Sequence, residues 1–170
     1  RRNVAATIVE VPHRELGGKI TPWTDLQALA AWSMERGIPL HCDGARFLEA
    51  TVAYEKTPAE LAALFDSVYI SFYKGLGGVA GAMLCGSKDF CEQARVWLRR
   101  FGGNLYTLMP YVVSAYDGYH SNWKDLLMIP PNNSEDKTAL SDEDVLEMDE
   151  IVVPPESSGI VPPVVEDLVV

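Results

Sequence analysis

The stretch SFYKGLGG, residues 71–78, follows an apolar, strand-like run and sets Lys74 directly before three nearby glycines. Glycines let a backbone turn sharply and approach a flat ligand without a Cβ clash. A lysine amine becomes a nucleophile for carbonyl compounds when burial or a neighbouring cation lowers its pKa. Lys74 is therefore a candidate Schiff-base lysine, although an ordinary surface lysine fits this segment taken alone. The Ser-x-x-Lys spacing from Ser71 also suggests a serine acyl-enzyme, but the supporting Ser-Asp-Asn and Lys-Thr-Gly elements are missing.

A second stretch, HCDGAR at residues 41–46, ends another strand-like run with an acid and a nearby base. At a strand end, Asp43 could keep a pyridine nitrogen protonated, which makes the ring an electron sink. Arg46 lies near a helix start, where its guanidinium could bind a carboxylate through two hydrogen bonds. The alternative for Arg46 is a surface ion pair, although a cation there opposes the helix dipole. A metal site of His41, Cys42 and Asp43 is a weak alternative because no partner ligands accompany them.

Strand-like and helix-like segments alternate along residues 1–120, which predicts an α/β fold with a mostly parallel sheet flanked by helices. Ligands of such sheets gather at the carboxyl ends of the strands. Asp43 and Lys74 each follow a predicted strand, so the two side chains are expected together at one edge. The predicted strands cover residues 4–11, 38–42, 67–72 and 79–85; the predicted helices cover residues 21–37, 45–54, 58–64, 87–101 and 108–119.

Net charge divides the chain into two predicted parts. Residues 1–120 are neutral, whereas residues 121–170 hold 12 acidic residues against two lysines and so carry the whole net charge of −10. Three Pro-Pro pairs interrupt this acidic tail, which predicts a solvated, mostly disordered segment without a confident domain. The alternative is a docking tail for a basic partner. No basic stripe indicates nucleic-acid binding, and no apolar run is long enough for a membrane span.

The three cysteines lack zinc-ligand spacing and indicate free thiols in a reducing compartment, for which we expect the cytoplasm. The chain opens at Arg1 rather than at a methionine, and no signal segment follows. A mature or truncated product is therefore expected.

Four strings occur in order across about 115 residues: EVPHRELGG (10–18), HCDGAR (41–46), YKGLGGVAG (73–81) and RRFGGNL (99–105). Together they resemble the second half of the large domain of the threonine aldolase and beta-eliminating lyase family, which are fold-type-I pyridoxal-phosphate enzymes. The resemblance covers residues 3–119. It implies that residues 1–120 are a partial large domain with pyridoxal 5′-phosphate as cofactor.

The resemblance also implies roles for individual residues. Lys74 forms the covalent link to the cofactor, Asp43 pairs with its pyridinium nitrogen, and Arg46 helps to bind the substrate carboxylate near the cofactor's phenolic oxygen. Ser71 matches a position that often contacts the cofactor phosphate. His13 and Glu10 belong to a family segment near the site, where ordinary loop contacts explain them equally well.

The implied reaction is retro-aldol cleavage of threonine or another β-hydroxy amino acid into glycine and an aldehyde, and beta-elimination remains an alternative. Family members suggest a homo-dimer or tetramer with sites at subunit interfaces. The family's phosphate loop and small domain have no counterpart in this sequence. Two hypotheses follow: a fragment or subunit of a working lyase, or a non-catalytic derivative that binds partners through its acidic tail. We expect weak cofactor binding and poor threonine cleavage from the chain by itself.

Overall fold

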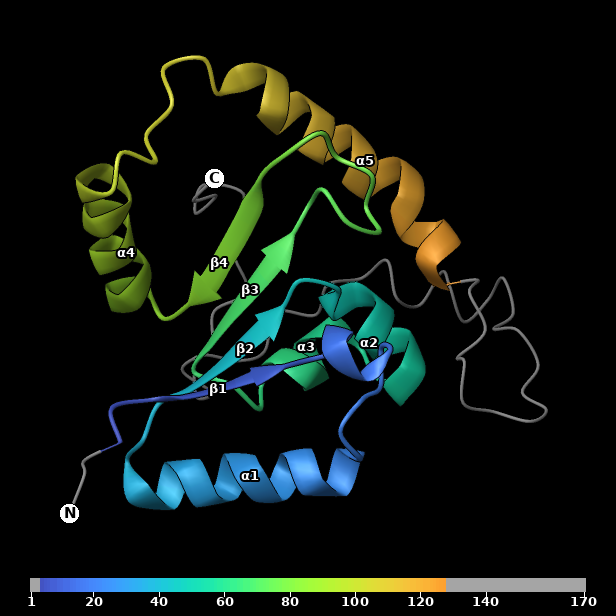
Figure 1. The fold of residues 1–170 in the computed structure, drawn as a ribbon, viewed down its shortest axis with the longest axis vertical. Coiled ribbons are helices and arrows are strands. Elements are labelled where there is room, and N and C mark those ends of the chain that lie inside the picture. Colours follow the sequence, from blue (N-terminus) through green and yellow to red (C-terminus); the bar gives the residue numbers. More distant parts are fainter. Residues whose placement is uncertain (1–3, 128–170) are drawn as a thin grey trace.

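Four strands form one sheet in the order β1-β2-β3-β4 in the computed structural model, which describes residues 4–127 (Figure 1). They are β1 (Thr7–Glu10), β2 (Leu40–Gly44), β3 (Ser67–Ser71) and β4 (Ala82–Gly86). The first three run parallel, and β4 runs antiparallel to β3. The predicted α/β fold with a mostly parallel sheet is therefore confirmed.

Helical segments connect and flank the strands at close to the predicted places. They are η1 (Arg14–Leu16), α1 (Trp23–Arg36), α2 (Phe47–Tyr54), α3 (Pro58–Ala62), α4 (Lys88–Arg100) and α5 (Met109–Leu127). Helix α1 ends where Gly37 takes the left-handed conformation, with φ of 61°. Helix α4 begins at Ser87, whose Oγ accepts a hydrogen bond from the backbone N–H of Phe90 at 3.3 Å. The end of α1 and the start of α4 follow from the capping preferences of glycine and serine.

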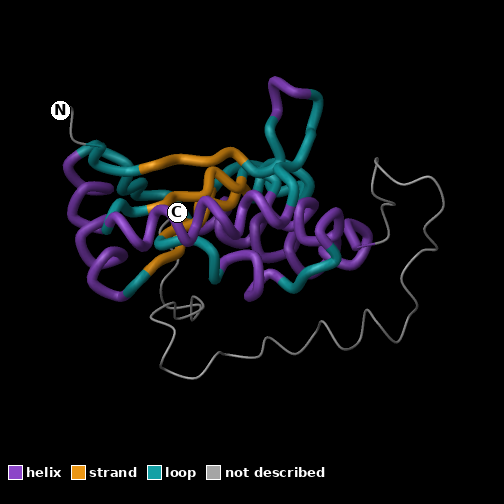
Figure 2. The backbone as a smooth tube through the Cα atoms, turned by 90° about the horizontal axis from the view of Figure 1, so that it is seen from below, coloured by secondary structure: helices purple, strands orange, loops and turns teal. Residues whose placement is uncertain are grey.

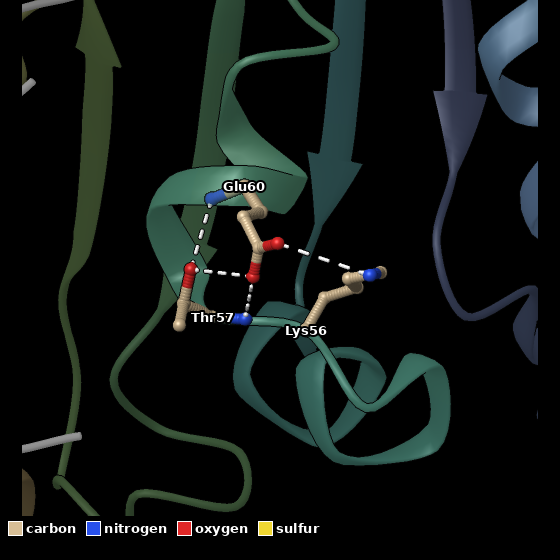
Figure 3. A network of polar contacts seen from close by, with 3 residues as sticks. All are labelled: Lys56, Thr57 and Glu60. Carbon is tan, nitrogen blue, oxygen red and sulfur yellow. Dashed lines mark hydrogen bonds and ion pairs between the residues drawn. The ribbon is translucent and has the colours of Figure 1, made fainter. Parts of the chain in front are cut away.

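Helix α3 is held at its start by a reciprocal capping box, which Figure 3 shows. The Glu60 backbone N–H donates to Thr57 Oγ1 at 3.2 Å, and the Thr57 backbone N–H donates to the Glu60 carboxylate at 2.8 Å. Lys56 adds an ion pair to the same carboxylate at 3.8 Å. These contacts satisfy N–H groups that have no partner within the helix.

Alternation along the strands gives the sheet one apolar and one polar face. The apolar face carries core side chains from successive strands: Val9, Leu40, Cys42, Val68 and Ile70. On the opposite side, which we call the polar face, lie Glu10, His41, Asp43, Tyr69 and Ser71, because Glu10, Asp43 and Tyr69 pair across the sheet. The polar face therefore collects the chemically reactive side chains of the strands.

Helix α5 is longer than the sequence predicted. The apolar pattern predicts its end at Tyr119, but the helix continues to Leu127. Packing explains the extension: Trp123 is 7% exposed within the core, and Asn122 Nδ2 donates to the Leu76 carbonyl at 2.8 Å. Tertiary contacts of this kind override local composition.

The described helix α5 runs past residue 120, and the predicted division into 1–120 and 121–170 stays a prediction. The acidic tail from residue 128 onward lies outside the described residues. Within residues 4–127, no helix has the length and apolar character that crossing a membrane requires.

Candidate active site

Asp43 is the polar residue at the carboxyl end of β2, the second strand of the sheet. It is half-buried, and its neighbours in register are Glu10 of β1 and Tyr69 of β3. Cys42 points to the other face and is fully buried, and burial raises the pKa of its thiol to about 12. The strand therefore presents a carboxylate on the polar face and a protonated thiol in the core.

Lys74 lies in a tight turn between β3 and β4. The backbone N–H of Gly77 donates to the Lys74 carbonyl at 2.9 Å, and that of Gly78 donates to the Phe72 carbonyl at 2.7 Å. Phe72 N–H in turn donates to the Gly81 carbonyl at 3.0 Å, which joins the two ends of the turn. These bonds explain why glycines follow the lysine: Gly77 has φ of 70°, a conformation that side chains disfavour.

Helix α5 packs against this turn from the outside. Ser114 Oγ accepts a hydrogen bond from the Val79 N–H at 2.9 Å, and Asn122 donates to the Leu76 carbonyl. Gly118 lies between these residues, and a Cβ added there would collide with the Leu76 carbonyl oxygen. The position of the Lys74 turn therefore depends on a helix about 40 residues further along the chain.

Three hydroxyl groups link β3 to the Lys74 turn. Ser71 Oγ donates to the Tyr69 hydroxyl at 3.0 Å, and the Tyr69 and Tyr73 hydroxyls lie 3.3 Å apart. Lys74 Nζ lies 5.1 Å from the centre of the Tyr73 ring, a cation–π contact. We call Tyr69, Ser71 and Tyr73 the hydroxyl chain.

Both candidate residues, Lys74 and Asp43, affect the pKa of Tyr73 in the hydroxyl chain. Hydrogen bonding by Tyr69 and Ser71 lowers the pKa of Tyr73; the positive charge of Lys74 lowers it further, and the negative charge of Asp43 opposes this change. Both charges therefore act on one hydroxyl group. Asp43 pairs in register with Tyr69 of the neighbouring strand, and Lys74 contacts the Tyr73 ring, so both residues adjoin the hydroxyl chain.

Arg46 precedes α2 directly and lies beside the loop that follows β1. Pro12, Arg14, Gly18 and Arg46 line a pocket of about 160 Å³. The loop containing η1 projects from the body of the molecule in Figure 2. Arg14 and Arg46, which are distant in the sequence, both contribute to the walls of this mostly apolar pocket. A guanidinium group at its rim would suit a carboxylate or a phosphate.

The sequence profile of the beta-eliminating lyase family matches residues 1–142, most of the chain. The chain belongs to the beta-eliminating lyase family. Aldolase vrtJ of Penicillium aethiopicum is 40% identical over 99 residues, which cover 58% of this chain and 24% of the relative. The low specificity L-threonine aldolase of Escherichia coli O157:H7 is 38% identical over 88 residues, covering 52% and 26%.

Two solved structures of the family share the fold. A protein from Exiguobacterium sp. 255-15, assigned as an aromatic amino acid beta-eliminating lyase/threonine aldolase, is 52% identical with a TM-score of 0.68, covering 69% of this chain and 33% of its own. A protein from Listeria monocytogenes EGD-E, assigned as an L-allo-threonine aldolase, is 44% identical with a TM-score of 0.72, covering 74% and 35%. The chain spans about a quarter of the length of the curated relatives given above.

Family membership confirms the resemblance seen in the sequence, including its restriction to part of the large domain. Members of the family are aldolases and beta-eliminating lyases, and they generally depend on pyridoxal phosphate. The residues present fit that group chemically, because the carboxyl ends of β2 and β3 and the turn after β3 supply a carboxylate, hydroxyl groups and an amine. The individual roles of Lys74, Asp43, Arg46 and Ser71 stay predictions.

The remaining predicted residues have clear structural contacts. Glu10 accepts a hydrogen bond from the Arg14 backbone N–H at 2.9 Å and thereby supports the η1 loop. His13 lies beside it, with Nδ1 3.8 Å from the Glu10 carboxylate. His41 Nδ1 lies 2.8 Å from Ser67 Oγ, and burial lowers the pKa of His41. Cys42 faces away from His41 and Asp43, so these three side chains do not converge on one ion.

Sequence reasoning missed Tyr69, Tyr73 and Arg14. Tyr69 matches an ordinary strand residue, Tyr73 directly follows the predicted strand, and only their spacing of two from Ser71 indicates a shared face. Arg14 lines the same pocket as Arg46 because of how the loop after β1 folds, which no local pattern indicates.

Proposed function

We propose that this chain carries part of the pyridoxal-phosphate site of a lyase that cleaves threonine or another β-hydroxy amino acid into glycine and an aldehyde. One observation carries the proposal: Asp43 pairs in register with Tyr69, whose hydroxyl lies 3.3 Å from that of Tyr73, and Lys74 Nζ lies 5.1 Å from the centre of the Tyr73 ring. An amine and a carboxylate so placed suit opposite sides of one small aromatic aldehyde. The family match supports the same reaction class.

Each residue has a role in this proposal. Lys74 supplies the amine that holds the cofactor, and Asp43 holds a proton at the ring nitrogen. Arg46, assisted by Arg14 across their shared pocket, binds the carboxylate of the amino acid. Ser71 is proposed to contact the phosphate, and in this structure its proton is donated to Tyr69. When bound, pyridoxal phosphate supplies the electron sink for breaking the Cα–Cβ bond.

The setting of the site is also a proposal. Because the chain spans a quarter to a third of its relatives, the complete activity is assigned to a larger assembly, a homo-oligomer of the family type. The substrate is a small amino acid. We place the protein in the cytoplasm, from its cysteine usage.

Borohydride reduction in the presence of pyridoxal phosphate, followed by peptide mapping, tests the proposal. Reduction fixes the cofactor on whichever amine has condensed with it. We expect the label on Lys74 in the wild type and its loss in Lys74→Ala. Lys88→Ala is the matched control, because Lys88 is an exposed lysine in a surface ion pair with Glu92. Label spread over surface lysines would contradict the proposal, and measured glycine and aldehyde release from threonine tests the reaction itself.

A further inference from the structure

Tyr69 and Tyr73 of the hydroxyl chain adjoin Lys74, and the proposed function leaves both without a chemical role. The side chains of Tyr69 and Ser71 lie on the polar face of β3, and Tyr73 directly precedes Lys74. Ser71 is 2% exposed and donates to the Tyr69 hydroxyl at 3.0 Å, and the Tyr69 and Tyr73 hydroxyls share a hydrogen bond of 3.3 Å. The chain of hydroxyls therefore ends on Tyr73, whose ring contacts the Lys74 amine.

The pKa values of the two phenols, Tyr69 and Tyr73, are shifted in opposite directions. Burial raises the pKa of Tyr69, so this residue stays a hydrogen-bond donor. Its hydrogen bond lowers the pKa of Tyr73, with the charges of Lys74 and Asp43 acting on Tyr73 in opposite directions. Tyr73 is 45% exposed, so its hydroxyl is open to molecules that reach the amine. Tyr73 is thus the stronger acid of the pair and the more accessible one.

We propose that Tyr73 is the acid–base partner of Lys74 when the lysine amine condenses with an aldehyde. Condensation first forms a carbon–nitrogen bond and leaves a hydroxyl group on the former carbonyl carbon. That C–O bond then breaks: the Tyr73 O–H gives its proton to the departing oxygen, water leaves, and the nitrogen lone pair forms the C=N bond. The products are a protonated imine, water and a Tyr73 phenolate, and the reverse reaction returns the proton to Tyr73.

Tyr69 and Ser71 are positioning residues in this proposal. The Tyr69 hydroxyl stabilises the phenolate left on Tyr73, and Ser71 orients Tyr69. A positioned acid typically contributes a factor of about 10² to 10⁴ to a rate. Because water also reaches Tyr73, we expect the lower end of that range. The inference rests on the proposed function only in taking Lys74 as the reactive amine.

Stopped-flow absorbance measures the rate of imine formation by the full chain with two aldehydes in parallel. One is pyridoxal phosphate, and the other is salicylaldehyde, which lacks the phosphate and the ring nitrogen. Borohydride trapping and peptide mapping give the fraction of the imine that forms at Lys74. Tyr73→Phe keeps the ring and its cation–π contact and removes only the acid. Tyr106→Phe is the control, because the Tyr106 side chain is fully exposed.

Tyr73→Phe is expected to slow imine formation and imine hydrolysis at Lys74 by the same factor, about 100-fold. The equilibrium constant should stay unchanged, because a catalyst accelerates both directions equally. Tyr69→Phe should slow both by about fivefold, the factor contributed by one net hydrogen bond. Tyr106→Phe should match the wild type.

Three results would overturn the inference. Equal rates in Tyr73→Phe and wild type exclude an acid–base role. A changed equilibrium constant with an unchanged hydrolysis rate indicates a purely structural role. Absence of imine at Lys74 with both aldehydes would show that Lys74 is not the amine that condenses with aldehydes. Imine at Lys74 with salicylaldehyde but not with pyridoxal phosphate contradicts the proposed function alone and leaves the salicylaldehyde rates to decide the role of Tyr73.

Discussion

Gly118→Ala tests whether helix α5 positions the Lys74 turn. In an unobstructed helix this change stabilises the protein by about 1 kcal/mol, because glycine is a poor helix former. Here the new Cβ would collide with the Leu76 carbonyl oxygen and lie 3.2 Å from the Gly78 nitrogen. Backbone atoms in a hydrogen-bonded turn cannot rotate away, so we take the upper end of typical overpacking costs, about 3 kcal/mol. The net effect is a destabilisation of about 2 kcal/mol.

Thermal and urea unfolding, followed by circular dichroism, measure this effect. A loss of about 2 kcal/mol lowers the Tm by about 4–8 °C in a chain of this size. Ser121→Ala is the matched control, since Ser121 is exposed on the same helix and alanine there should stabilise by a few tenths of a kcal/mol. A Gly118→Ala protein as stable as the wild type, or more stable, would refute the packing of α5 on the turn.

Three further perturbations address the rest of the fold. Thr57→Ala should destabilise the protein by about 1 kcal/mol in urea unfolding, because it removes the side-chain cap of α3; an unchanged midpoint would contradict the capping box. The Thr57 backbone N–H lowers the pKa of Glu60, so the stabilisation by Glu60 is present above the unfolded-state pKa of about 4.3 and disappears as pH falls through the lower folded-state pKa. Urea unfolding of wild type and Glu60→Ala should therefore differ near neutral pH and converge in acid, whereas a constant difference would show that ionisation is irrelevant. Burial raises the pKa of Cys42 to about 12, so iodoacetamide in mild alkali should label Cys42 slowly in the folded chain and rapidly in urea, as judged by mass spectrometry; equal rates would place the thiol outside the core.

Strand positions and the shared edge of Asp43 and Lys74 were predictable from the sequence. Apolar runs that end in a polar residue and a glycine mark the carboxyl ends of β2 and β3. Parallel pairing then brings the two ends together without further information. The start of β4 was predicted three residues early, because residues 79–81 belong to the turn after Lys74, whose ends are joined by the bond from the Phe72 N–H to the Gly81 carbonyl.

Features that depend on contacts between distant residues were not predictable in this way. The end of α5 is fixed by Trp123 in the core and by the bond from Asn122 to the Leu76 carbonyl. The pocket between Arg14 and Arg46 depends on how the η1 loop folds back beside α2. The residue pattern within α5 or within the η1 loop does not indicate these contacts with distant residues.

Helix α5 places one serine, one glycine and one asparagine against the Lys74 turn, and none of these three residues carries a charge. Directed evolution of a slow variant of this site should accordingly recover second-site suppressors at positions 114 and 122, because position 118 has no space for a side chain. Such suppressors would restore activity while leaving every ionisable group unaltered. Lys74 and the residues that set the position of its turn are therefore separately mutable parts of the chain.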